Sequence, residues 1–232
     1  MPERPHVIIA MPQYGHVSPR AMGSFVELVI NSMGRGIVRA VMFSQDCGLM
    51  DVVRNGLVVD CFTQHPTMTH IMWVDSDMVV PPDAIMTLLG DDKPIVGGLY
   101  HQKTEPFTPV VYEFDPFRRL DEPFNHMRRV GGLGLGCTLV RADVYKEMAL
   151  HYGDAAWHQL SGNDGEDAFF FERCGEMGVE TWLDPSVSCG HVRDHVVTTE
   201  DWERQRALTA VKTTRLPPLA SLPPSFGKEP LE

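Results

Sequence analysis

The sequence predicts an α/β fold with a mostly parallel central sheet and a smaller mixed sheet. Through residues 5–105, short apolar runs bounded by Gly or Pro alternate with segments of helical periodicity, as in a doubly wound unit. One apolar run, residues 70–74, ends directly at Asp75-Ser76-Asp77. Open α/β sheets bind ligands beyond the carboxyl ends of their strands, so this acidic pair marks the expected ligand-binding edge.

The first half of the chain is predicted to supply four strands and three helices. The strands are expected at residues 7–11, 36–43, 70–74 and 94–100. Ser is a favoured N-cap and Pro fits the first helical position, so Ser18-Pro19 is expected to open a helix that runs to about Met33. The other helices are expected at residues 51–64 and 82–90.

The regular alternation of predicted strands and helices ends after about Pro106. Strands are expected at residues 109–114, 137–140 and 181–184, helices at 142–150 and 166–176, and a turn then leads to His191. We expect a single domain over residues 1–214, in which about 5–105 bind the nucleotide and about 106–214 close the site. Residues 215–232 are rich in Pro and are expected to form an extended tail.

The amino-acid composition disfavours several classes of protein, among them disordered chains, basic nucleic-acid binders and disulfide-rich domains. The chain has 232 residues, 43% of them hydrophobic, enough for a substantial core. A net charge of −11 argues against a strongly basic nucleic-acid groove. The five cysteines lack C-x-x-C spacing, so we expect reduced thiols rather than disulfides or a zinc site. No bilayer-length apolar run and no signal-peptide pattern is present, and we expect a cytoplasmic protein.

Three short motifs carry the chemistry. Asp75 and Asp77 can hold a divalent cation, and the cation can hold a diphosphate. Glu166 and Asp167 fall in the first turn of a helix, where acids either stabilise the helix dipole or act as a general base. His191 follows Gly190, which allows the backbone to turn a side chain into a cleft; a core or surface histidine is the alternative.

In order and approximate spacing, these motifs resemble GT-A glycosyltransferases. The strand that ends at Asp75-Ser76-Asp77, the strand at 95–100, the glycine-rich run 132–140, Gly165-Glu166-Asp167 and Gly190-His191 carry the resemblance, which covers roughly residues 5–192. The chain most resembles the short, stand-alone enzymes of bacteriophages and bacteria. Some of these are implicated in decorating hydroxymethylated bases in phage DNA.

The resemblance implies a GT-A (Rossmann-like) nucleotide-diphospho-sugar transferase fold and a role for each motif. Asp77 would bind the metal directly, Asp75 would contact the ribose or the metal through water, and His191 would be the late metal ligand. Asp167 would be the base of an inverting transfer, and Glu166 would orient the acceptor. The residues expected to bind the donor are Pro12, Gln13, Tyr14, Arg54, Asn55, Asp75, Ser76 and Asp77.

The implied activity is transfer of a sugar from a nucleotide-sugar donor, a UDP-sugar, to an acceptor hydroxyl with Mn²⁺ or Mg²⁺. The sugar would be a hexose or a pentose, and retention of anomeric configuration remains the alternative to inversion. DNA with a hydroxymethylpyrimidine, a polysaccharide, a protein and a small molecule all stay open as acceptors. Arg118-Arg119 and Arg128-Arg129 are either phosphate contacts or solvated surface. Lys103 is either a diphosphate contact or, in the preferred interpretation, a solvated surface lysine.

Two other functions compete. A sugar-1-phosphate nucleotidyltransferase also uses carboxylates and a metal, but it usually has a basic, Gly-rich loop after the first strand, and residues 12–16 lack basic side chains of that kind. A non-catalytic nucleotide- or glycan-binding module is disfavoured by the full set of acidic residues and His191. The run Gly131–Gly136 is not a dinucleotide-binding fingerprint, because its spacing is wrong and it precedes a strand.

Overall fold

The computed structural model describes residues 4–13, 17–44, 48–104, 106–114, 118–122, 124–154, 156–160 and 165–193. These residues belong to one compact unit that spans residues 1–193. The predicted tail at 215–232 lies outside the described residues.

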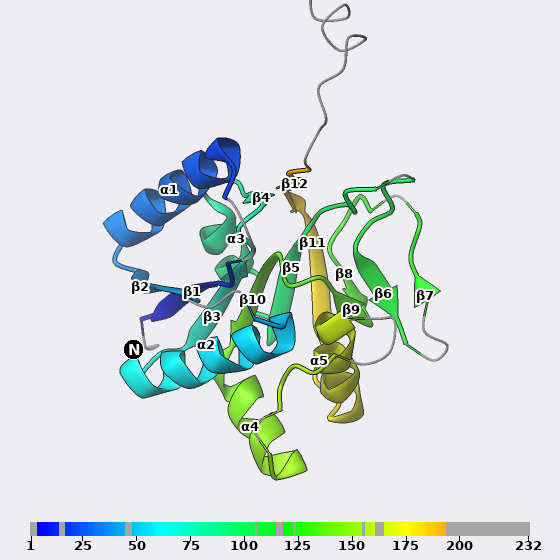
Figure 1. Cartoon of the computed structure of the whole chain (residues 1–232). Helices are drawn as coiled ribbons and strands as arrows, with labels where there is room; N and C mark the ends of the chain where they lie inside the picture. The colour runs from blue at the N-terminus through cyan, green and yellow to red at the C-terminus, as the bar shows by residue number, and fades with distance from the viewer. Residues whose placement is uncertain are drawn as a thin grey trace, which may run out of the picture. The chain divides into compact units, whose positions relative to one another are not determined.

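A seven-stranded sheet forms the centre of the fold (Figure 1). Strands β1, β2, β3, β5 and β11 run parallel to one another, whereas β10 and β8 run antiparallel to their neighbours. In spatial order the strands are β2 (Val38–Phe43), β1 (Val7–Met11), β3 (His70–Val74), β10 (Cys137–Arg141), β5 (Ile95–Leu99), β11 (Thr181–Ser188) and β8 (Arg128–Val130).

Helices cover both faces of this sheet. On one face lie α1 (Pro19–Gly34) and α3 (Ala84–Gly90), and on the other lie α2 (Met50–Gln64), α4 (Ala142–Tyr152) and α5 (Gly165–Glu176) (Figure 1). Side chains alternate along each strand, and in β1 Ile8 packs with the second group of helices while Ile9 packs with the first. Strands covered on both faces must be apolar throughout, which explains the uninterrupted apolar runs of β1 and β3.

Two small antiparallel sheets stand beside the central one. One joins β4 (Met78–Val79) to β12 (Gly190–His191), and the other has the order β7 (Arg118–Arg119), β6 (Val111–Glu113), β9 (Gly132–Leu133). The β4–β12 pair follows directly on Asp77, so it belongs to the structure of the candidate site.

The predicted fold class is confirmed. Ser18 caps α1, since its hydroxyl accepts a hydrogen bond from the amide of Ala21, with Pro19 as the next residue. The two halves expected from the sequence share one sheet, because β10 and β11 from the second half flank β5 from the first. In the part of the chain that the structure describes, no helix is long and apolar enough to cross a bilayer.

Candidate active site

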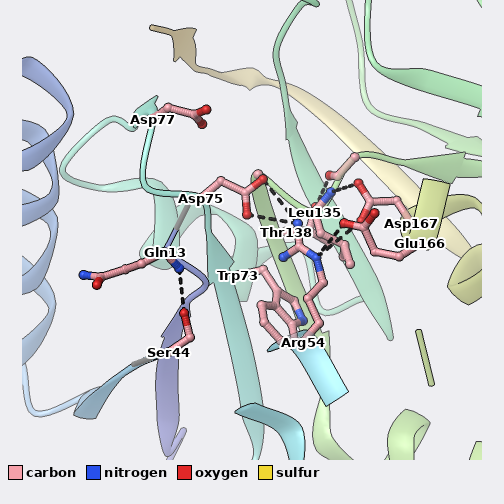
Figure 2. A network of polar contacts seen from close by, with 12 residues as sticks. Gln13, Ser44, Arg54, Trp73, Asp75, Asp77, Leu135, Thr138, Glu166 and Asp167 are labelled. Atoms are coloured by element: carbon pink, nitrogen blue, oxygen red, sulfur yellow. Dashed lines mark hydrogen bonds and ion pairs between the residues drawn. The ribbon is translucent and has the colours of Figure 1, made fainter. Parts of the chain in front are cut away.

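The site begins at a tight turn after β3. The amide of Asp75 donates to the carbonyl of Gly136, and the amide of Met78 donates back to the carbonyl of Asp75, both at 3.1 Å. The turn between these two bonds therefore directs the side chains of Asp75 and Asp77 to different surroundings (Figure 2). Ser76, between them, is buried.

Arg54 of α2 holds the first aspartate of the motif. Its Nη2 lies 3.0 Å from Oδ1 of Asp75, and its Nε lies 3.1 Å from Oε1 of Glu166 and 3.6 Å from Oδ1 of Asp167 (Figure 2). The guanidinium also lies 5.2 Å from the ring centre of Trp73. One cation thus joins the turn after β3 to the first turn of α5.

Burial alone would favour a neutral Arg54, because its side chain is only 2% exposed. The three carboxylates outweigh that desolvation and raise its pKa above the ordinary value. The guanidinium is therefore a fixed positive charge, and removing it would leave the three carboxylates without a compensating cation.

Asp167 has a pKa far from that of an ordinary carboxyl group. One oxygen, Oδ2, accepts a hydrogen bond from the amide of Leu135 at 3.0 Å. Burial raises the pKa of Asp167 to about 7, with Glu166 and Asp75 adding to the rise and Arg54 opposing it. Such a carboxyl group exchanges protons near neutral pH, which is the property that a general base needs.

Asp77 has a different set of partners. Its Oδ1 lies 3.5 Å from Nε2 of His191, and its Oδ2 forms an ion pair with Nζ of Lys103. Burial opposes ionisation of Asp77, but the contacts with His191 and Lys103 outweigh it and lower the pKa to about 2. Asp77 is therefore a carboxylate at neutral pH.

Strand pairing brings His191 to Asp77 across more than a hundred residues of sequence. In the β4–β12 ladder His191 is opposite Met78, and the amide of Val192 donates to the carbonyl of Asp77 at 2.8 Å. Nδ1 of His191 lies 2.8 Å from the carbonyl oxygen of His101, so Nδ1 carries the proton of this bond. Nε2 is thereby left as the nitrogen that faces Asp77.

This arrangement suits a metal cation. Nε2 of His191 and Oδ1 of Asp77, an imidazole nitrogen and a carboxylate oxygen 3.5 Å apart, are ligand types that Mn²⁺ accepts. A backbone carbonyl that fixes the other ring nitrogen is the usual support for a metal-binding histidine. Within the described ranges, however, no cluster of three or more His, Cys, Asp or Glu side chains is arranged to hold a metal ion. Asp75, the third expected ligand, is paired with Arg54.

The other expected donor contacts are distributed as follows. The amide of Gln13, after β1, donates to the hydroxyl of Ser44 at 2.8 Å, and Pro12 is buried beside it. The side-chain amide of Asn55 is occupied by the backbone of His158, donating at 2.7 Å and accepting at 3.0 Å. Asn55 thus has a structural partner here, and Tyr14 lies outside the described residues.

The glycines between β9 and β10 make room for Tyr100. A Cβ on Gly134 would lie 1.8 Å from the hydroxyl oxygen of Tyr100, and one on Gly136 would lie 3.0 Å from its ring. The amide of Gly136 donates to the same hydroxyl at 3.2 Å, and the Tyr100 ring meets His191 edge-on at 5.5 Å. A buried tyrosine, rather than a cofactor, thus explains the need for glycine at these positions.

Sequence reasoning missed the positions of Lys103 and His101. A lysine four residues beyond the end of β5 carries no local sign of an ion-pair partner, and a backbone carbonyl carries none at all. The contacts of Lys103 and His101 follow only from the tertiary structure, in which the β4–β12 pairing places His191 beside Asp77.

No family model matches the sequence, and no curated protein matches it. Solved structures do resemble it. A197 from STIV has a TM-score of 0.55 and 19% identity over 82% of this chain and 86% of its own. GalNAc-T7 with UDP, GalNAc and Mn²⁺ has a TM-score of 0.55 and 10% identity over 83% of this chain and 45% of its own.

The catalytic domain of Drosophila β1,4-galactosyltransferase 7 with xylobiose has a TM-score of 0.51 and 15% identity, covering 87% of this chain and 79% of its own. At these identities the likeness concerns the fold. The chain therefore has the GT-A fold of nucleotide-diphospho-sugar transferases.

Proposed function

We propose that this chain is a metal-dependent glycosyltransferase that moves a sugar, a hexose or a pentose, from a UDP-sugar to an acceptor hydroxyl. The observation that carries the proposal is the meeting of Asp77 and His191 at the carboxyl end of β3. The fold supports it, because two of the solved structures that resemble this chain, GalNAc-T7 and β1,4-galactosyltransferase 7, are glycosyltransferases, and GalNAc-T7 was crystallised with UDP and Mn²⁺.

Asp77 and His191 would hold Mn²⁺ or Mg²⁺, with further positions left for diphosphate oxygens and water. A divalent cation at this place would neutralise the charge that develops on the leaving nucleoside diphosphate. Asp75 would then serve the ribose or a metal-bound water, since Arg54 already holds its carboxylate.

Donor binding is assigned to the first half of the chain, about residues 5–105. A cavity of about 640 Å³ lies beside Ser44, Val52 and Val53, and Ser44 also holds the backbone of Gln13. Val53 immediately precedes Arg54 on α2, so the base of the nucleotide is assigned to this side of the site. Acceptor binding is assigned to residues 106–214.

Asp167 would act as the base of an inverting transfer. Its Oδ2 is held by the amide of Leu135 and retains a second lone pair, and the side chain is 20% exposed. A carboxylate with a pKa of about 7 accepts a proton from the acceptor hydroxyl more readily than one with an ordinary pKa. Glu166 would orient the acceptor, with Arg54 fixing its carboxylate at 3.1 Å.

The ion pairs of Arg128 and Arg129 favour solvated surface over phosphate contacts for this arginine pair. Arg128 is paired with Glu122 at 2.7 Å and Arg129 with Glu180 at 3.2 Å. These guanidinium groups already have acidic partners, so DNA carrying a hydroxymethylpyrimidine has no special support as acceptor. It remains one arm of the acceptor test, beside a polysaccharide, a protein and small alcohols.

The test is a donor screen. Wild type and Asp77→Asn are incubated with and without Mn²⁺, in one arm with UDP-, GDP- and dTDP-sugars and in a second with nucleoside triphosphates and a sugar 1-phosphate, and released nucleoside diphosphate and pyrophosphate are measured. We expect Mn²⁺-dependent release of UDP from a UDP-sugar by wild type only. Release of pyrophosphate from a nucleoside triphosphate and a sugar phosphate would favour a nucleotidyltransferase, and binding without turnover would favour a binding module.

A further inference from the structure

Lys103 contacts one of the two oxygens of the carboxylate that the proposed cation site requires. Nζ of Lys103 is paired with Oδ2 of Asp77, while Oδ1 faces Nε2 of His191 at 3.5 Å. The Lys103 side chain is 39% exposed and that of Asp77 33%, so the ammonium group has a path away from the carboxylate. The ion pair between Lys103 and Asp77 is therefore present in this structure, and its exposure allows the two side chains to separate.

The loop that carries Lys103 is fixed at both ends. His101 pairs with Pro109 in a β-bridge, the amide of Gln102 donates to the carbonyl of Thr108 at 3.0 Å, and the Thr108 hydroxyl donates to the Gln102 side chain at 2.9 Å. The carbonyl of His101 in this same loop holds Nδ1 of His191 at 2.8 Å. One loop thus orients the histidine and places an ammonium group on its aspartate.

We infer that Lys103 is the resident counter-ion of Asp77, which leaves Asp77 when a divalent cation binds and then pairs with the donor diphosphate. The inference rests on the proposed function. An ammonium group and a dication on a single half-buried carboxylate repel each other, and one negative charge cannot balance three positive ones. The diphosphate supplies the missing negative charge.

Two consequences follow from the competition between Lys103 and a divalent cation for Asp77. Without nucleotide, Lys103 keeps the affinity of Asp77 and His191 for a divalent cation low. With nucleotide, metal and donor strengthen each other's binding, because the diphosphate removes Lys103 from Asp77 and bridges to the metal. The coupling is reciprocal, so it is measurable from either ligand.

The experiment measures Mn²⁺ binding by electron paramagnetic resonance of the free ion, with and without UDP. Lys103→Met keeps the aliphatic length but removes the charge, Lys103→Arg keeps the charge, and Lys146→Met on the exposed side of α4 is the matched control. We expect Lys103→Met to bind Mn²⁺ alone on the order of tenfold more tightly and UDP in saturating Mn²⁺ on the order of tenfold more weakly. Lys103→Arg and Lys146→Met should resemble wild type.

The outcome that overturns the inference is an unchanged or weaker affinity of Lys103→Met for Mn²⁺ alone. A Lys103→Arg variant that behaves like Lys103→Met would overturn it as well, because the effect would then come from the loop and not from the charge. Failure of the proposed function looks different: wild type would show no Mn²⁺-dependent binding of UDP. The Mn²⁺ titration without nucleotide decides the role of Lys103 in either case.

Discussion

Arg54 Nη2 lies 3.0 Å from Oδ1 of Asp75, in an ion pair that ties helix α2 to the turn after β3. The same guanidinium reaches Glu166 and Asp167 at the start of α5. The two aspartates of the acidic motif therefore have separate tasks. Asp75 belongs to a network around Arg54, and Asp77 belongs to the pair with His191.

Arg54→Met should lower the free energy of unfolding by about 3–5 kcal/mol at neutral pH, because it leaves three partly buried carboxylates without their cation. The loss should shrink as the pH falls and these carboxylates become protonated. Urea denaturation at pH 7.5 and pH 5 measures both effects. Arg20→Met, at an exposed position of α1, is the matched control. A loss below about 1 kcal/mol at neutral pH would mean that Arg54 is not the stabilising centre of the network.

Asp167→Asn should lower turnover at least about a hundredfold and yet raise the melting temperature at pH 8. The folded protein raises the pKa of Asp167 from 3.8 to about 7, so its carboxyl group stabilises the fold most at pH below 3.8. That contribution is lost as the pH rises through 7, and asparagine avoids the loss.

The same pKa sets the pH profile. Turnover of the wild type should rise with pH and level off above about pH 7, where Asp167 is deprotonated. Near-wild-type turnover in Asp167→Asn would remove Asp167 from the base role. A lower melting temperature at pH 8 would show that burial of its charge does not destabilise the fold.

Much of this fold was predictable because its local patterns agree with its tertiary structure. Apolar runs such as residues 7–11 become buried strands, and Ser18-Pro19 begins a helix as these residue types favour. The short strands β4 and β12 were not predictable, since two-residue strands have no periodicity. The motifs identified the acidic residues and His191 as candidates. The residues that contact them could not be predicted, because they are distant in sequence.

Arg54 illustrates the difference between what the sequence alone could predict and what depends on tertiary packing. Its residue type and place on α2 suggested a nucleotide contact, whereas its burial on Trp73 and its three acidic partners depend on how α2, β3 and α5 pack. Asn55, the next residue, is committed to the backbone of His158 instead. Two adjacent residues of one predicted motif thus have different surroundings, which no local pattern specifies.

Gly134→Ala should destabilise the fold and weaken Mn²⁺ binding. A Cβ at this position would lie 1.8 Å from the Tyr100 hydroxyl, so the tyrosine that contacts His191 would have to move. Gly175→Ala is the control, since nothing lies within 4 Å of its Cβ and alanine favours its helix. Thermal melting and Mn²⁺ titration of both variants measure the effect. Equal melting temperatures for Gly134→Ala and wild type would contradict this role of the glycine.

His158→Phe should reduce the acid sensitivity of the fold. Neither ring nitrogen of His158 has a hydrogen-bond partner among the described residues, and the ring stacks on Phe170. Burial, with Arg54 adding to it, lowers the pKa of His158 well below 6.5. The native state therefore keeps His158 neutral, and its contribution to stability, full above about pH 6.5, is lost as the pH falls below that value.

The variant should remove a slope of about 1.4 kcal/mol per pH unit below pH 6.5, measured as the difference in unfolding free energy from wild type. Urea denaturation at pH 7, 6 and 5 provides the comparison. Parallel pH profiles for the two proteins would show that His158 is protonated in the folded state.

Mn²⁺-dependent binding of UDP, measured by calorimetry, tests the central claim most directly. The wild type should bind UDP only when Mn²⁺ is present, and Asp77→Asn should weaken this binding at least about a hundredfold while Asp92→Asn, an exposed position in the turn after α3, should not. The melting temperatures of the variants show that each is folded. UDP affinity that is the same in wild type and Asp77→Asn, or the same with and without Mn²⁺, would contradict a cation site built on Asp77 and His191.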